Sequence, residues 1–324
     1  MITTTALAMA CIAAAPSPFW AGPLSFGAPD ATTPPTEQEV APLGQSMETS
    51  TSFSIQGSWV WQLKADLHNT TNGRFSHDRG YFSARARIAL SDDLDLLLGG
   101  RYQRDNFSFE GIPSPWTNVN TNSFNAGLKY KLTPQWQIFG GGQARWAAEE
   151  GASLGDGFEG GGAIGAAYAF SRDLVIGGGV GVRSQIEDDL LIYPIIVLDW
   201  KIIDRLSLST RLTTGWSGQS GVELVYEVQP TIDVGMSLTF DYQRFRLGDD
   251  AMTMTRTPGG VGVTEALPLT VFIAIDVRPN ISLTAFVGAT VYGRLKTTDS
   301  VGNNVWARNQ DPAPVLGFQG AIRF

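Results

Sequence analysis

This 324-residue chain contains stretches in which apolar residues occupy every second position, and charged residues lie at some of the positions between them. A charge in such a stretch needs water, a counterion or a function. The basic set comprises Arg85, Arg87, Arg101, Lys129, Arg183 and Arg211. The acidic set comprises Glu223, Glu227, Asp233, Asp241 and Asp276. Facing each other across a water-filled passage, the two sets would orient polar solutes and select ions. The alternative is a passage that the same charges close as structural ion pairs.

A second candidate for chemistry is the segment His68-Asn69-Thr70-Thr71-Asn72-Gly73. It loosely resembles the His-x-Ser-Asn-Gly segment of outer-membrane phospholipase A. The resemblance implies a rim esterase in which His68 is the base and Thr70 or Thr71 the nucleophile. The segment departs from that pattern by an inserted residue and by threonine in place of serine, and no carboxylate nearby in sequence would orient the histidine. We therefore favour a polar loop and assign no catalytic residue.

Several acidic clusters raise the question of a metal site, because carboxylates bind Ca²⁺. They comprise Glu149, Glu150, Asp156, Glu187, Asp188, Asp189, Asp249 and Asp250. Their spacing does not match a calcium-binding loop, so solvated acids are favoured and no metal is expected. Gly160, Gly162 and Gly165 match a dinucleotide-binding pattern, but a period-two segment follows where that pattern needs a helix. We expect no cofactor.

Composition narrows the class of protein. No stretch approaches the roughly 18 apolar residues of a helical membrane span. The net charge of −8 argues against a nucleic-acid partner. The only cysteine, Cys11, lies near the start of the chain, so disulfide chemistry is not expected in the remainder.

From residue 52 onward, apolar residues alternate with small or polar ones for about ten positions at a time, a spacing typical of strands. The clearest example is Leu267, Leu269, Val271, Ile273, Ile275 and Val277. Successive side chains of a strand point to opposite faces, so each stretch predicts a strand with one apolar face and one polar face. A soluble β-sandwich would show the same alternation, so the turns and the chain end must distinguish a sandwich from a membrane barrel.

Tight breaks alternate with longer polar stretches along the chain. The breaks lie at 91–93, 133–135, 171–173, 203–205, 230–231 and 279–280. The polar stretches lie at 67–79, 105–122, 147–157, 246–264 and 293–314. Short periplasmic turns alternating with long outer loops are typical of outer-membrane barrels. We predict an all-β, closed antiparallel transmembrane β-barrel over residues 51–324, with about 14 strands and 12 as the alternative. Trp116 and Trp306 in the predicted loops could stack on sugars or on neighbouring chains, although loop anchors are favoured.

The chain ends in an alternating strand that finishes with an aromatic residue. Leu316, Phe318, Gly320, Ile322 and Phe324 share one face of this strand. It resembles the C-terminal signature of bacterial outer-membrane β-barrels. The resemblance implies a bacterial outer-membrane location, contact with outer-membrane lipid, and recognition by the barrel assembly machinery through Phe318, Ile322 and Phe324. It singles out no individual protein, and it leaves the oligomeric state open.

Residues 1–15 are interpreted as a signal peptide that ends near Ala13-Ala14-Ala15. The usual basic start is missing, which a true start codon upstream of Met1 would explain. Residues 16–50 are rich in Pro and Thr and predict a disordered periplasmic lead-in. For the whole chain we expect a passive pore or transporter for small polar solutes. A structural or adhesive barrel with a plugged lumen is the alternative, and a rim esterase is a remote one.

Overall fold

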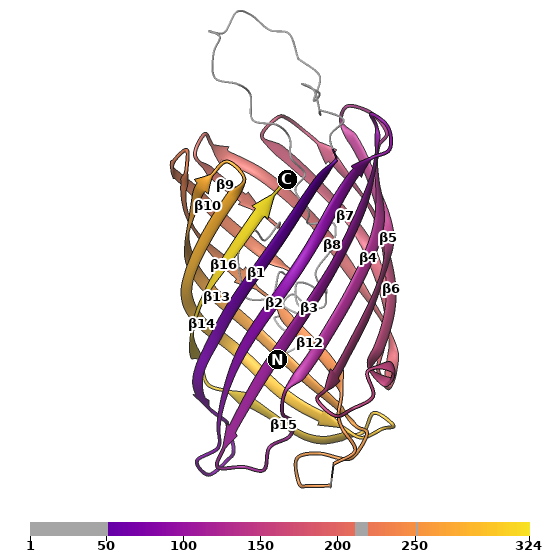
Figure 1. Ribbon diagram of the computed structural model, residues 1–324, viewed down its shortest axis with the longest axis vertical. Helices are drawn as coiled ribbons and strands as arrows, with labels where there is room; N and C mark the ends of the chain where they lie inside the picture. Colours follow the sequence, from indigo (N-terminus) through magenta and orange to yellow (C-terminus); the bar gives the residue numbers. More distant parts are fainter. Residues whose placement is uncertain (1–50, 211–219, 251) are drawn as a thin grey trace, which may run out of the picture.

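The computed structural model describes residues 51–210, 220–250 and 252–324. Fourteen antiparallel strands close into a barrel, and two shorter strands extend it at one end (Figure 1). The first eight wall strands are β1 (Ser52–Asp66), β2 (Arg74–Ala89), β3 (Leu94–Glu110), β4 (Val119–Lys131), β5 (Trp136–Glu149), β6 (Phe158–Ala169), β7 (Leu174–Gln185) and β8 (Asp188–Ile203). The other six are β9 (Leu206–Ser209), β10 (Gly221–Gln229), β11 (Ile232–Thr239), β13 (Val261–Arg278), β14 (Ile281–Thr298) and β16 (Ala313–Arg323). The two extra strands are β12 (Asp241–Arg246) and β15 (Asn304–Gln310), and a short 3-10 helix, η2 (Gly155–Gly157), precedes β6.

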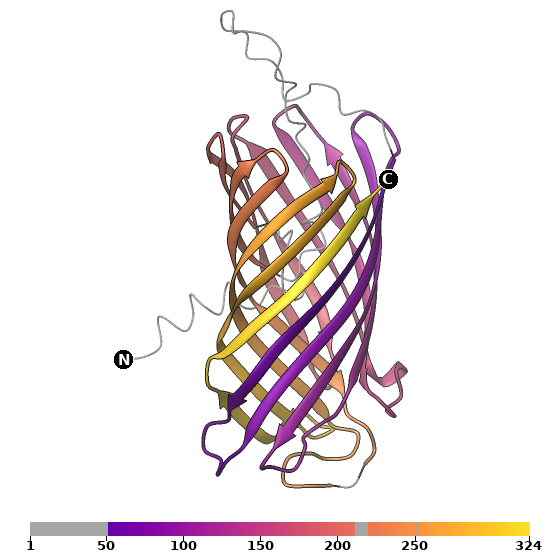
Figure 2. The same ribbon diagram turned by 60° about the vertical axis from the view of Figure 1, so that its left-hand side comes forward.

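The barrel closes where its first and last strands meet. In Figure 2 the yellow β16 runs alongside the indigo β1, and the two strands pair antiparallel, with Ile55 opposite Ile322. Phe53 and Phe324 exchange two backbone hydrogen bonds of 3.1 and 2.8 Å. Among the described residues, this pairing joins the two ends of the sheet into a ring, the form that strands need in lipid.

The six predicted tight turns are confirmed. Each lies between consecutive wall strands, at the barrel end where Ser52 and Phe324 also lie. The predicted outer loops are too long, because the strands continue past the apolar belt. The loop predicted at 105–122 shrinks to 111–118, since water-exposed strand ends keep their backbone pairing without needing apolar side chains.

The stretch predicted as a loop at 293–314 is mostly strand. β14 and β15 form a hairpin there, joined by a turn at 299–303. The Asp299 carboxylate accepts hydrogen bonds from the Asn303 side chain at 2.9 Å and from the backbone amides of Asn303 and Val301 at 2.8 and 3.0 Å. These bonds hold the pKa of Asp299 below its ordinary value, the Asn303 side chain contributing most. The turn is therefore built by local hydrogen bonds rather than by an apolar core.

The outer face of the wall is apolar. Large side chains there remain strongly exposed in the isolated chain, including Phe82, Phe124, Ile164, Val271 and Val287 at 52, 60, 66, 52 and 56%. No helix in the described ranges is long and apolar enough to cross a membrane. A closed sheet with an apolar exterior and charged side chains inside is the form in which strands cross a bilayer.

One part of the sheet leaves the wall. The alternation from Ile232 to Tyr242 predicts a single strand, but the structure interrupts it after Thr239. The following β12 pairs with the start of β13 on one side and touches β5 on the other, with Arg246 opposite Ala148. Phe240 and Phe245 are 9% and 0% exposed, so they do not face lipid. The expectation that Phe240 and Tyr242 belong to the lipid-facing wall is wrong, because β12 crosses the outer end of the barrel.

Candidate functional site

The inner half of the lumen contains charged side chains that water can reach. Arg85 on β2, Glu227 on β10 and Asp276 on β13 are exposed, and Asp233 on β11 is half-buried. Within the described ranges, the side chains of these residues form no hydrogen bond or ion pair with one another or with any other residue. An exposed side chain that points into a closed barrel marks space wide enough for water.

Arg85, Arg87, Arg101 and Lys129 lie on one arc of the wall, β2 to β4, and Glu227, Asp233 and Asp276 lie on another, formed by β10, β11 and β13. Arg183 on β7 lies between the two arcs. Five wall strands, β5 to β9, separate β4 from β10 on one side, and β14, β16 and β1 separate β13 from β2 on the other. On the acidic arc, Glu227 is directly opposite Asp233 in the β10–β11 register. On the basic arc, Arg87 bonds Asp95 at 2.9 Å, and Lys129 is buried opposite Asp95 in the β3–β4 register. The two arcs therefore differ in sign at the inner mouth.

The remaining predicted charges are engaged or buried. Arg101 donates to Gln103 at 2.7 Å and lies 3.9 Å above the ring of Tyr81. Arg183 and Glu223 are 4% and 0% exposed. Arg211 lies outside the described residues. Arg101, Arg183 and Glu223 face inward, but their contacts and burial separate them from the accessible lumen.

Asp241 joins the two arcs directly. The Arg79 guanidinium bonds Asp105 at 2.6 Å and Asp241 at 2.8 Å. Asp105 also contacts His77 at 2.8 Å and accepts a hydrogen bond from Gln103 at 2.7 Å. Arg79 and Asp105 are 1% and 0% exposed. Across the outer half of the lumen, opposite charges therefore meet as a closed ion network rather than facing each other through water.

Sequence reasoning missed Arg79 and Asp105 because both fall inside predicted loops. A signal was present: Arg79 is in phase with Arg85 and Arg87, and Asp105 is in phase with Arg101 and Gln103. Continuing the alternation past the apolar belt would have placed both residues on the inward face.

Several acidic residues that were considered as calcium ligands instead form ion pairs with arginines of β12 and of the loop that follows it. Arg256 binds Glu149 through both guanidinium amino groups, at 3.1 and 2.9 Å. Glu149 also accepts the backbone amide of Gly248 at 2.8 Å. Arg246 bonds Glu187 at 2.7 Å, and Arg244 bonds Asp188 at 3.0 Å. These acids serve as counterions, and among the described residues no cluster has the arrangement of a metal site.

An aromatic core completes the closure of the outer end. Trp116 is fully buried, with the rings of Phe245, Phe107 and Trp306 at centroid distances of 5.3, 5.8 and 6.5 Å. All three contacts are edge-on, a geometry that aromatic pairs favour. Trp116 and Trp306 are therefore internal anchors, and the suggestion that they stack on sugars is wrong.

Inward aromatic rings in the wall lie against glycines of the neighbouring strand. Tyr193 is directly opposite Gly181, and Phe139 is directly opposite Gly165. A Cβ added at Gly181 would lie 2.1 Å from the Tyr193 ring. The missing side chains let the rings lie over the backbone instead of projecting into the lumen. The interpretation of Gly160 to Gly165 as barrel wall is confirmed, because this segment lies within β6.

The His68 segment does not assemble a nucleophile and a base. The Thr70 hydroxyl donates to the carbonyl of Leu67 at 2.7 Å and accepts the amide of Gly73 at 3.1 Å, so it shapes the turn. His68 contacts Asp311 at 2.5 Å, a carboxylate that only the tertiary structure brings near. A hydrogen-bonded polar loop describes this segment.

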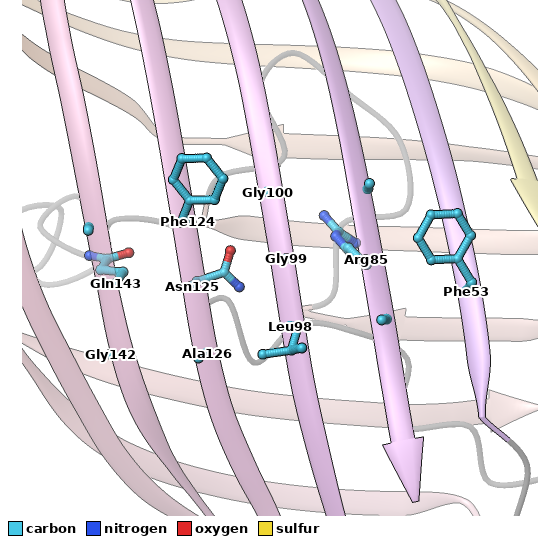
Figure 3. Close-up of a pocket in the computed structure, with 13 residues that line it drawn as sticks. Phe53, Arg85, Leu98, Gly99, Gly100, Phe124, Asn125, Ala126, Gly142 and Gln143 are labelled. Atoms are coloured by element: carbon cyan, nitrogen blue, oxygen red, sulfur yellow. The ribbon is translucent and has the colours of Figure 1, made fainter. Parts of the chain in front are cut away.

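A hollow of about 640 Å³ lies on the outside of the wall. Most of its lining residues face outward: Phe53, Leu98 and Phe124 surround a floor of small residues such as Gly100 and Ala126 (Figure 3). It opens toward the bilayer rather than the lumen, so it is not part of a solute path.

Comparisons with known proteins give one partial family match and several structural similarities at low sequence identity. The family model described as TonB-dependent receptor-like β-barrel matches residues 25–172, less than half of the chain. A search of curated proteins finds no match. Similar solved structures include an outer-membrane channel from Pseudomonas putida F1, 10% identical, covering 86% of this chain and 97% of that one at a TM-score of 0.46. The P. putida toluene transporter TodX is 9% identical, with 85% and 90% covered and a TM-score of 0.40. Acinetobacter baumannii OccAB4 is 9% identical, with 87% and 100% covered and a TM-score of 0.33.

The closed strand order and the apolar outer wall require a bilayer around the barrel. Antiparallel barrels with an even number of strands, and with short turns at the end where the first strand begins and the last strand ends, are the architecture of bacterial outer-membrane proteins. The protein is a transmembrane β-barrel of the bacterial outer membrane.

Proposed function

We propose that the protein is a channel for small polar solutes in which β12 and the described parts of the following loop, residues 247–250 and 252–260, form a movable constriction. One observation carries the proposal: β12 leaves the wall and crosses a lumen whose inner half contains water-accessible charges. A barrel of fourteen strands has more interior than its wall side chains fill, so an added internal segment can block or admit solute.

The contacts of β12 suit a segment that moves. Its attachments to the opposite arcs are ion pairs and hydrogen bonds, made by Asp241, Arg244 and Arg246. Water and solute ions can replace such contacts when the segment shifts, whereas the wall ladder stays intact. The accessible Arg85, Glu227 and Asp276 would then act on solute that passes the inner mouth.

The second candidate is a structural or adhesive barrel with a permanently plugged lumen. The packed core around Trp116 favours it, because a dry aromatic cluster resists opening. A channel should conduct ions and a permanently plugged barrel should not, so variants that weaken the constriction can distinguish the two functions.

The decisive experiment weakens the constriction without touching the wall. The double variant Arg244→Gln with Arg246→Gln removes both guanidinium groups that hold β12 to the β7–β8 turn. We expect its single-channel conductance or open probability in planar bilayers to rise several-fold over the native protein. The matched control is Arg172→Gln with Arg205→Gln, which removes two exposed arginines from inner turns and should leave conductance unchanged.

A crosslink provides the opposite perturbation. Ala148 and Arg246 are register partners, so cysteines at both positions can tie β12 to β5. Oxidation should lower the conductance of this variant, and reduction should restore it. If the native protein and the folded double-glutamine variant are both non-conducting, the plugged structural barrel is the better account.

A further inference from the structure

Arg183, on β7, is a buried arginine whose hydrogen-bond donors are largely unused. The residue is 4% exposed. Its Nε and one of its amino groups are buried and have no hydrogen-bond partner among the described residues. A buried guanidinium without acceptors is costly, because each unmade bond leaves a desolvated donor uncompensated. The position therefore calls for a ligand that supplies acceptor oxygens.

The carboxylate near Arg183 is already engaged by another arginine. Glu159, on β6, is two residues from Gly161, the register partner of Arg183, so the two side chains are diagonal neighbours. One oxygen of Glu159 accepts a hydrogen bond from Arg145 at 2.6 Å, and the other is buried without a partner. Arg145 and Glu159 both act electrostatically on Arg183. The cluster of these three side chains therefore has one positive charge in excess and one unused acceptor.

β12 covers this cluster. Arg145 also donates to the backbone carbonyl of Arg244 at 2.9 Å. The Tyr242 hydroxyl donates at 3.2 Å to Gln185, which follows Arg183 by two residues on β7. The cluster thus lies between the wall and the proposed constriction, where a bound solute would contact both.

A row of register partners connects Arg183 with the accessible inner mouth. From β2 to β7 its members are Arg85, Gly99, Asn125, Gln143, Gly161 and Arg183. Arg85 lies four residues before Ala89, the inner end of β2, whereas Arg183 lies nine residues after Leu174, the inner end of β7. The row therefore climbs from the inner mouth toward β12, because the strands of a barrel are tilted.

The row presents hydrogen-bond donors separated by small residues. The side chains of Arg85, Asn125 and Gln143 follow one another along it (Figure 3). The side-chain nitrogen of Asn125 is buried without a partner among the described residues. Gly99 and Gly161 have no side chain, so the wall between the donors stays open. A negatively charged solute would meet successive donors between the inner mouth and Arg183.

We propose that Arg183, Arg145 and Glu159 bind a small 2-hydroxycarboxylate, and that this row is its route from the inner mouth. The carboxylate would pair with the planar fork of Arg183 and neutralise the excess charge. The hydroxyl would donate to the unused oxygen of Glu159. A simple carboxylate satisfies only the arginine, whereas a hydroxycarboxylate satisfies both groups. The route, unlike the site, rests on the channel function proposed above.

Equilibrium binding tests the site without requiring conduction. The full barrel, folded in detergent in a chloride-free buffer, is titrated with glycolate and with acetate by isothermal titration calorimetry. Glycolate should bind about tenfold more tightly than acetate, because only glycolate has the hydroxyl. Arg183→Gln should lose at least about tenfold in glycolate affinity, and Arg183→Lys, which keeps the charge without the paired donors, should bind at an intermediate level. The control Arg172→Gln removes an exposed arginine from an inner turn and should bind like the native protein.

The possible outcomes separate the site from the route. If neither acid binds to the folded native protein, the unused donors hold only water and the proposal fails. Unchanged glycolate affinity in Arg183→Gln, with normal heat-modifiable folding, also overturns it. Chloride that displaces glycolate at equal concentration would show an unselective anion site instead of a hydroxycarboxylate site. A protein that binds glycolate through Arg183 but gives no conductance in planar bilayers would keep the site and lose both the route and the channel.

Discussion

The inner and outer halves of the barrel have the same wall, but their inward-facing charged side chains differ in burial and pairing. In the inner half Arg85, Glu227 and Asp276 are exposed to the lumen and form no ion pair with a described residue. In the outer half Arg79, Asp105 and Asp241 are buried and joined to one another. Since the wall alternation is the same in both halves, the difference comes from β12, which brings a carboxylate and a packed core into the outer half.

The difference teaches that an inward charge has no fixed role in a barrel of this width. Where water fills the lumen, the charge acts on solute, and its removal costs little stability. Where a segment fills the lumen, the same residue type becomes part of a buried network, and its removal leaves a buried partner uncompensated. Residues on one strand can therefore be assigned to different roles by experiment.

The largest expected effect contrasts two arginines of the same strand and the same face. Arg79→Ala leaves two buried carboxylates without their cation and should lower the free energy of unfolding by about 3–5 kcal/mol. Arg85→Ala removes a solvated charge and should change it by less than about 0.5 kcal/mol. Urea unfolding in lipid vesicles measures both values. Equal effects would contradict the division of the lumen into a solvated and a packed half.

The next effect tests the two faces of the wall. Ile273 faces lipid on β13, so Ile273→Arg should cost roughly 2–4 kcal/mol if it lies near the bilayer midplane. Asp276 on the same strand faces the lumen beside other carboxylates, so Asp276→Arg should be tolerated. Ala274 is an unsuitable inward control, because it packs against the buried apolar cluster that contains Phe272 and Phe286. Similar losses at Ile273 and Asp276 would mean that the facing is misassigned.

A smaller effect concerns the aromatic rings that lie on glycines. Gly181→Ala places a methyl group against the Tyr193 ring and should destabilise the barrel by about 1–3 kcal/mol while lowering conductance, because the ring must turn into the lumen. Gly142→Ala, where the added Cβ meets only a carbonyl oxygen at 3.5 Å, is the control and should have little effect on either quantity. Unchanged conductance in Gly181→Ala would show that the ring does not border the solute path.

The smallest effect in energy is the most specific to transport. Arg85→Gln should shift the reversal potential toward cation selectivity, and Glu227→Gln with Asp276→Asn should shift it toward anions. Both shifts should grow in dilute electrolyte, since charges are screened over about 8–10 Å at physiological salt. If the protein conducts but neither substitution changes its ion selectivity, the channel function would stand, and the opposed charges on the two arcs would have no role in selecting ions.

The sequence by itself determined the wall. Period-two alternation, the six tight turns and the terminal aromatic strand are local properties, and they predict strand number, facing and closure because a strand's two faces follow from its backbone. The sequence did not predict the strand ends beyond the apolar belt. Strands such as β14 continue into water, where they have no apolar face, and the alternation therefore predicted loops there.

Only the tertiary structure decided what fills the barrel. Phe240 and Tyr242 continue the alternation of β11, yet the chain leaves the wall after Thr239, because what lies beyond depends on partners from β2, β5 and the β7–β8 turn. The pairing of Arg79 with Asp241, and of Arg256 with Glu149, joins residues more than a hundred positions apart. Alternation records which face a side chain takes, but it contains no information on what that face meets across the lumen.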